Sequence, residues 1–202
     1  MYRFSAFIIV LFTFFTVTEI LEAQTNVKTG AKGGLNFANF TGADAEFETR
    51  TGFVIGGFAK FDIPDSPFAI QPEAMYSQKG AVDSGNEIRI DYIEIPVLLK
   101  YSFAPGSTAQ PNLFAGPYAG IRLIAEREGG AGGLFGGSSN LENQTESIDY
   151  GGVFGAGIDI EVGTSIFTFD VRYGFGFRNV FREESGRNGV LSVTVGISLP
   201  DM

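Results

Sequence analysis

Charged side chains spaced two residues apart are the part of this sequence that could do chemistry. Asp159 and Glu161 form one such pair, and Asp170 and Arg172 form another. In an extended strand this spacing places both side chains on the same face. There, carboxylates can act as a general acid and base, line a path for ions, or pair with neighbouring cations.

The charged residues predicted to form one network on a shared polar face are Glu73, Glu94, Lys100, Arg122, Asp159, Asp170 and Arg172. Lys79 and Glu161 have the same predicted orientation. Mutual pairing is the favoured role, because a buried charge without a partner is strongly destabilising. We expect Arg122 and Arg172 each to bond at least one of the carboxylates Glu73, Glu94, Asp159 and Asp170.

The composition excludes most other chemistry. The sequence has no histidine and no cysteine, and its net charge is −9. The commonest general base and the usual transition-metal ligands are therefore missing, and an acidic chain is unsuited to nucleic acid. We predict no catalytic residues, no cofactor, no metal site and no nucleic-acid partner.

One glycine-rich segment, 129–137, superficially suggests a phosphate-binding loop. It lacks the lysine and the strand-to-helix context that such a loop requires. We interpret it as a surface loop, with Leu134 and Phe135 exposed at its tip.

The elements that carry the charged residues alternate with period two and show no helical periodicity. From Phe167 to Phe177 the odd-numbered residues are aromatic or apolar, and the even-numbered ones are small or polar. The segments predicted as strands are Thr29–Phe40, Gly52–Asp62, Phe68–Lys79, Glu87–Tyr101, Asn112–Glu126, Ile148–Val162, Ile166–Phe177 and Gly189–Leu199.

Strands of this length favour a membrane barrel over a soluble sandwich or a soluble ligand-binding barrel. A tilted membrane strand needs about 9 to 11 residues, whereas soluble strands have about 5 or 6. The predicted fold is all-β, an eight-stranded antiparallel up-and-down transmembrane β-barrel with apolar faces toward lipid and polar faces filling a narrow lumen. The aromatic residues expected to face lipid are Tyr76, Tyr101, Phe167, Phe169, Tyr173 and Phe175.

The N-terminus has the pattern of a secretory signal peptide. Arg3 precedes an apolar stretch from residue 4 to residue 17, and Ala23 stands at a plausible cleavage site. A spanning helix would need about 20 apolar residues, but Glu19 and Glu22 come too soon. We predict residues 1–23 as the signal peptide and residues 24–202 as a barrel exported to the outer membrane of a Gram-negative bacterium.

The predicted connections alternate between two kinds, as expected of a barrel with a turn side and a loop side. Those predicted to face the periplasm are Asp62–Pro67, Ser102–Pro111 and Gly163–Ser165. Those predicted to face outside are Thr41–Thr51, Gly80–Asn86, Arg127–Ser147 and Arg178–Asn188.

Two features conflict with regular strands. Pro72, Pro96 and Pro117 fall inside predicted strands, where proline cannot donate a ladder hydrogen bond, so we expect bulges or strand ends there. Within Glu87–Tyr101 the apolar residues change from even to odd positions. This change predicts a bulge near Asp91–Ile93.

Short motifs are distributed along the whole chain after residue 23. They are Lys32–Phe37, Gln71–Glu73, Tyr76–Gly80, Tyr92–Tyr101, Gly116–Gly120 and Gly155–Asp159. Together they resemble the PorT-like outer-membrane β-barrel proteins of Bacteroidota. The resemblance implies an eight-stranded barrel and, for most members, no assigned activity, although a namesake takes part in secreting proteins across the outer membrane. One departure is the C-terminus, where such barrels often end on an aromatic residue but this chain ends in Met202.

These observations favour one function and leave others open. The favoured function is a structural, interaction or secretion-assembly role for a barrel with a closed, charge-plugged lumen. The alternatives are a pore for ions or small solutes and, disfavoured by the missing histidine, an outer-membrane enzyme. The expected partners are outer-membrane lipid and, through the outer loops, other envelope or secretion proteins.

Overall fold

The computed structural model describes residues 27–42, 47–83, 85–128, 138–141, 145–181 and 186–199. The strands are β1 (Val27–Thr41), β2 (Glu48–Asp62), β3 (Phe68–Asp83), β4 (Asn86–Ser102), β5 (Ala109–Glu128), β6 (Ser138–Asn140), β7 (Ile148–Val162), β8 (Ser165–Asn179) and β9 (Arg187–Leu199). In the described ranges, no helix is long and apolar enough to cross a membrane.

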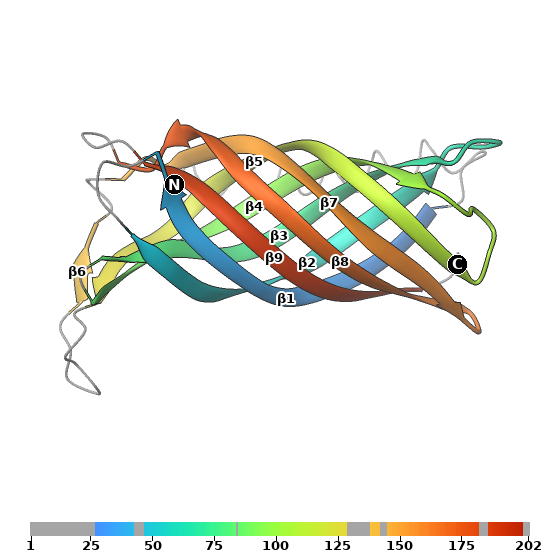
Figure 1. Ribbon diagram of the computed structural model, residues 1–202, viewed down its shortest axis with the longest axis horizontal. Helices are drawn as coiled ribbons and strands as arrows, with labels where there is room; N and C mark the ends of the chain where they lie inside the picture. The colour runs from blue at the N-terminus through green and yellow to red at the C-terminus, as the bar shows by residue number, and fades with distance from the viewer. Residues whose placement is uncertain are drawn as a thin grey trace, which may run out of the picture.

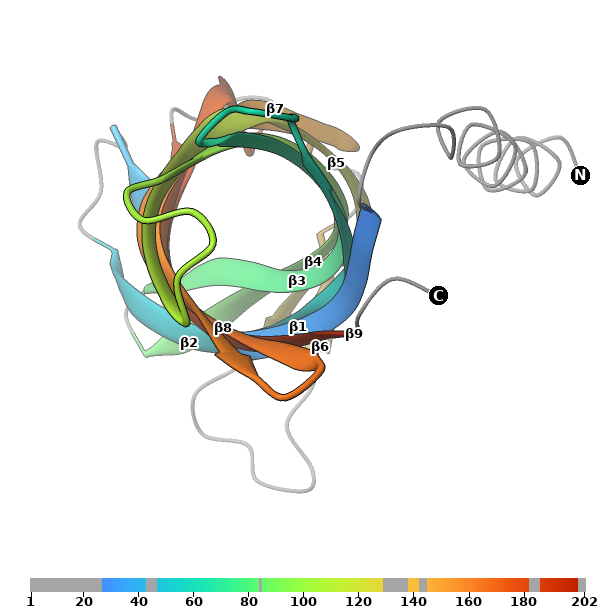
Figure 2. The same ribbon diagram turned by 90° about the vertical axis from the view of Figure 1, so that its right-hand side faces the viewer.

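Eight of these strands close into an antiparallel barrel. They pair around the ring in the order β1, β2, β3, β4, β5, β7, β8 and β9, and β9 pairs back with β1. The strands run obliquely along the long axis (Figure 1), and the ring is closed in the end view (Figure 2). The short strand β6 pairs only with the last residues of β5. The predicted eight-stranded barrel is therefore confirmed.

The two ends of the barrel differ. At the turn end, the connections 63–67, 103–108 and 163–164 join neighbouring strands, and β1 begins and β9 ends there. The other end, which we call the loop end, carries β6 and the two longest connections, 129–147 and 180–186 (Figure 1). One predicted loop, Gly80–Asn86, is mostly strand, because β3 and β4 pair as far as Asp83 and Asn86.

Alternation along each strand separates an outer wall from a lumen. On β8, Phe169 has 46% of its surface exposed and its neighbour Asp170 only 2%. Every second residue therefore points outward, and the residues between them fill the interior.

Bulky lumenal side chains lie opposite glycines on the next strand. Gly155 pairs with Phe114, and a Cβ on this glycine would lie 2.6 Å from Cζ of that ring. Gly30 and Phe58 form a second such pair, also at 2.6 Å. The glycine-rich polar face thus makes room for large side chains inside a narrow ring.

The prolines do not interrupt the strands, contrary to the prediction of bulges or strand ends. Pro72, Pro96 and Pro117 lie within β3, β4 and β5, opposite Val97, Tyr118 and Gly152 respectively. The register shifts of the barrel lie elsewhere, after Thr49, Asp91 and Phe175. Each proline removes one donor from the ladder, and the pairs on either side of it keep the register.

The bulge expected within β4 near Asp91–Ile93 is not found; a bulge lies opposite it on β5, and it does not explain the change of apolar parity in β4. The extra residue is Leu123 of β5, because Asp91 pairs with Ile124 and Tyr92 with Arg122. Meanwhile β3 and β4 keep one register along their whole length. Even-numbered residues of β4 therefore point inward throughout, and the interior itself changes from polar to apolar toward the loop end.

This apolar part of the lumen, which we call the apolar cap, joins several elements. Its buried members are Phe40, Ala81, Ile88, Ile90, Tyr92, Ala125, Leu141 and Val180, with Phe47 and Phe181 packed against them.

Candidate functional site

The lumen contains three layers of charged residues, of which the central layer is the most buried. Here Lys32 donates hydrogen bonds to Glu73 (2.9 Å) and to Asp170 (2.8 Å). Arg172 donates from Nη1 to Glu73 (2.6 Å) and from Nη2 to Asp170 (3.1 Å). The layer thus balances two cations against two carboxylates.

The second layer lies toward the turn end and is centred on Asp159. Its carboxylate accepts hydrogen bonds from Lys100 (3.0 Å), Lys60 (3.3 Å) and Thr168 (3.1 Å). Beyond it, the pair between Lys28 and Asp62 marks the edge of the lumen, with side chains 22% and 34% exposed.

The third layer lies toward the loop end and surrounds Lys79. This ammonium pairs with Glu94 (2.5 Å) and Asp149 (3.4 Å). It also lies 4.6 Å from the ring centroid of Tyr118, whose hydroxyl donates to Asp149 (3.0 Å). Asn188 donates a further hydrogen bond to Asp149 at 2.8 Å. Cation–π contact and ion pairing together compensate for the burial of Lys79.

Several of these contacts join opposite walls. In the ring order, three strands separate β3 from β8 in either direction, so the bond between Glu73 and Arg172 crosses the full diameter. Three strands also separate β2 from β7 in either direction, so the bond between Lys60 and Asp159 crosses the diameter as well. Side chains therefore meet at the centre of the lumen in two separate layers.

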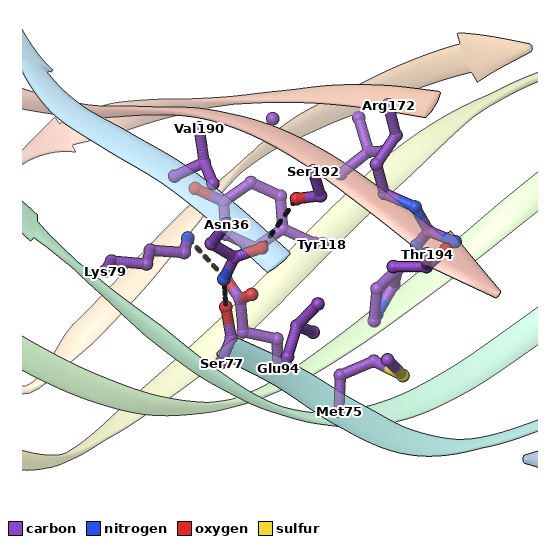
Figure 3. Close-up of a pocket in the computed structure, with 14 residues that line it drawn as sticks. Asn36, Met75, Ser77, Lys79, Glu94, Tyr118, Arg172, Val190, Ser192 and Thr194 are labelled. Atoms are coloured by element: carbon purple, nitrogen blue, oxygen red, sulfur yellow. Dashed lines mark hydrogen bonds and ion pairs between the residues drawn. The ribbon is translucent and has the colours of Figure 1, made fainter. Parts of the chain in front are cut away.

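A cavity of about 40 Å³ lies between the central layer and the layer around Lys79. Asn36 crosses it, since its Nδ2 donates to Ser77 (2.9 Å) and its Oδ1 accepts from Ser192 (2.7 Å). Figure 3 shows Asn36 between these two serines, with Lys79 and Arg172 on either side. The space is small and is lined by both polar and apolar side chains, with room for little more than a few water molecules.

Most residues of the predicted charge network lie in these layers. Glu73, Asp170 and Arg172 belong to the central layer, Lys100 and Asp159 to the turn-side layer, and Glu94 to the layer around Lys79. Glu161, also predicted to point inward, lies at the turn end and accepts from Gln110 (3.0 Å).

Arg122 contradicts the prediction. It bonds none of the four carboxylates and instead donates from Nη1 to the carbonyl of Thr145 (2.7 Å) and to its hydroxyl. Arg122 lies at the loop end beside the Leu123 bulge, and Glu94 is already paired with Lys79. Arg122 therefore holds the segment around Thr145 in place at the loop end and is not part of the charged layers.

Lys32, Lys60 and Asp149 belong to the charged layers but are not among the residues predicted to form the charge network. On β1, Lys32 lies on the same face as the inward-pointing Asn36. On β2, Lys60 lies on the same face as the inward-pointing Phe58. Alternation alone could therefore have placed both lysines inward. Asp149 lies between Ile148 and Tyr150, so the same alternation places it on the polar face.

The six aromatic residues predicted to face lipid lie on the outer wall. Phe167, Phe169 and Tyr101 are between 37% and 46% exposed, while Tyr173 and Phe175 pack against Phe154. Tyr76 is partly buried, and its hydroxyl donates to Asp91 (2.5 Å).

Two predictions lie outside the described residues, namely the signal peptide and the loop tip at Leu134 and Phe135. Among the described residues, no group of three or more histidine, cysteine or acidic side chains could hold a metal ion.

Comparison with solved structures gives barrels of the same architecture. Neisserial surface protein A is 15% identical with a TM-score of 0.56, and the match covers 86% of this chain and 96% of that one. A major outer membrane protein from Thermus thermophilus is 11% identical with a TM-score of 0.53, covering 86% and 98%. At these identities the likeness shows the fold alone.

The sequence itself identifies the family. No curated protein matches the chain closely enough to be compared with it. The family model described as "Outer membrane protein beta-barrel domain" matches residues 22–182. The chain therefore belongs to this family of outer-membrane β-barrel proteins.

Proposed function

We propose that this protein is a structural or interaction barrel of the outer membrane whose lumen is closed by its own charged side chains. The observation that carries this proposal is the contact between Glu73 and Arg172 across the full diameter, at 2.6 Å. An eight-stranded barrel is just wide enough for side chains to fill. A lumen filled in this way leaves the outer surface and the loops as the parts available to partners.

The alternative function is a pore for ions or small solutes, which the charged lining alone would also suit. The closed lumen is favoured because the charges pair with one another across the lumen, with side chains of Lys32 and Glu73 completely buried. We assign no catalytic role to the carboxylates of the three charged layers, since lysine or arginine engages each of them.

Planar-bilayer recording tests the closed lumen. The refolded full-length protein is expected to insert without steady single-channel conductance, whereas a porin of known conductance recorded in the same membranes serves as the positive control. Steady unitary currents from the wild-type protein would refute the closed lumen and favour the pore.

The second part of the proposal is that the loops contact other envelope proteins, as in a PorT-like branch of the family with a role in secretion assembly. Motifs such as Tyr92–Tyr101 support this assignment. Crosslinking in the native envelope, followed by identification of co-purified proteins, should recover secretion components repeatedly. Recovery of lipid and abundant porins alone would contradict it.

A further inference from the structure

The loop end of the lumen is closed by a different kind of chemistry from the rest. The members of the apolar cap that come from β4 are Ile88, Ile90 and Tyr92, with exposed fractions of 2%, 0% and 1%. In a membrane barrel the inward face is expected to be polar. Apolar residues on this face must therefore be covered by other parts of the protein.

The covering residues come from the connections at the loop end. The ring of Phe40 lies 5.2 Å from that of Phe47 and 5.3 Å from that of Phe181, both edge-to-face. Leu141 and Val180 are 8% and 3% exposed. The segments before β2, after β5 and after β8 thus meet over the mouth of the barrel.

Hydrogen bonds hold these segments in place. Leu141 donates its backbone N–H to Ala125 (2.9 Å), and Glu146 donates to Val180 (2.8 Å). Thr145 forms a bridge with Phe181. The segment after β5 is therefore tied both to the barrel wall and to the segment after β8.

The turn end has a different lining. Its inward positions include Lys28, Asp62 and Lys60, which are joined in ion pairs, and the first two are partly exposed. Water can solvate such groups, whereas a packed apolar cluster excludes both water and ions.

We infer that the apolar cap is a lid that keeps water-soluble solutes out of the lumen at the loop end, independently of the central and turn-side charged layers. This inference deepens the proposed function, since it rests on a closed lumen and identifies a separate seal at one end. The layer around Lys79 adjoins the cap, because Lys79 Nζ lies 5.2 Å from the ring centroid of Tyr92. Neutralising the central layer or the layer around Asp159 should therefore leave the lid intact.

Cysteine labelling can test the lid directly, because the chain contains no native cysteine. Val190 lines the cavity. It lies two residues after Asn188 on β9, and Asn188 pairs with Phe40 of the cap. Val190 is therefore directly behind the cap. Val190→Cys in the folded protein is treated with a small cationic methanethiosulfonate reagent. Lys28→Cys at the turn end is the positive control and should react rapidly.

We expect Val190→Cys to react slowly with the reagent. Adding Phe181→Ser should increase the reaction rate by on the order of tenfold or more, because an opened lid admits the reagent. Phe103→Ser is the matched control, since this ring is 59% exposed at the turn end. It should leave the rate unchanged. Leu141→Ser provides a second opening variant if Phe181→Ser does not fold, as judged by heat-dependent gel mobility.

The lid is refuted if Val190→Cys reacts as fast as Lys28→Cys, or if neither opening variant that folds accelerates the reaction. These outcomes are separate from failure of the proposed function. Steady conductance of the wild-type protein refutes the closed lumen, whereas rapid labelling of Val190→Cys in a non-conducting barrel refutes the lid alone.

Discussion

Arg172 and Glu73 come from opposite walls of the barrel, yet Nη1 of the arginine lies 2.6 Å from Oε2 of the glutamate. Lys32 of β1 and Asp170, which lies on β8 two residues before Arg172, complete the layer. Two long side chains therefore span the lumen, and their length matches the width of an eight-stranded ring. If the lumen is closed as proposed, the stability of the barrel and the closure of its lumen depend on the same contact.

Removing one partner of this layer should be strongly destabilising. Glu73→Gln leaves Lys32 and Arg172 with Asp170 as their only carboxylate, so we expect a loss of about 3–5 kcal/mol in the free energy of unfolding. Urea unfolding in lipid vesicles measures it. Lys28→Gln, which breaks a partly exposed pair, should lose only about 0–1 kcal/mol. Equal losses for the two variants would contradict the special role of the central layer.

Gly155 and Gly174 both face the lumen but should respond differently to a methyl group. At Gly155 the Cβ would lie 2.4 Å from the carbonyl oxygen of Val171 and 2.6 Å from the Phe114 ring. At Gly174, which borders the cavity, the nearest atom is 3.8 Å away. Gly155→Ala should therefore cost about 1–3 kcal/mol through overpacking, whereas Gly174→Ala should be close to neutral. The same urea titration measures both, and a destabilised Gly174→Ala would show that the cavity cannot accept a methyl group.

The sequence predicts the barrel well because alternation is a local property. Within each strand, alternation separates a polar face from an apolar face. Glu73, Asp159 and Asp170 can therefore be placed inward without knowledge of their partners. Which cation each carboxylate meets depends on how the strands are staggered around the ring, and no single strand carries that information. Arg122 illustrates the limit, since its inward parity was read correctly but its partner, Thr145, lies in a connection.

The apolar cap could not be predicted for a related reason. Ile88 and Ile90 obey the same alternation as the lipid-facing residues of other strands. The unbroken register between β3 and β4 and the packing of Leu141 and Phe181 show that they face inward. A change of parity in one strand therefore suggests a bulge. In this barrel the lining of the lumen changes from polar to apolar instead.

Arg122 should control the order of the segment around Thr145. Arg122→Met removes both hydrogen bonds to this residue while keeping an apolar side chain of similar length. Because the barrel wall is unaffected, we expect faster proteolytic cleavage between residues 138 and 147 with an unchanged urea midpoint. Arg178→Met, which breaks the partly exposed pair with Glu146, should have a smaller effect on the rate. Wild-type cleavage rates in Arg122→Met would contradict the fastening role.

Asp91 is completely buried on the outer wall, where it accepts hydrogen bonds from Tyr76 Oη (2.5 Å) and Arg89 Nε (3.0 Å). Asp91→Ala should destabilise the barrel by about 1.5–3 kcal/mol, because it removes a charged acceptor from both donors. Tyr76→Phe removes the bond from Tyr76, leaves those from Arg89 in place, and should cost about 1 kcal/mol.

The two changes should not add, because the Tyr76 hydroxyl has already lost its acceptor in Asp91→Ala. The double variant is therefore expected to unfold with nearly the free energy of Asp91→Ala alone, as measured by urea titration in lipid vesicles. Phe169→Leu, a change on the outer wall of β8 far from this cluster, is the control and should add fully to either single variant. Full additivity of Asp91→Ala and Tyr76→Phe would mean that their bond contributes nothing to stability.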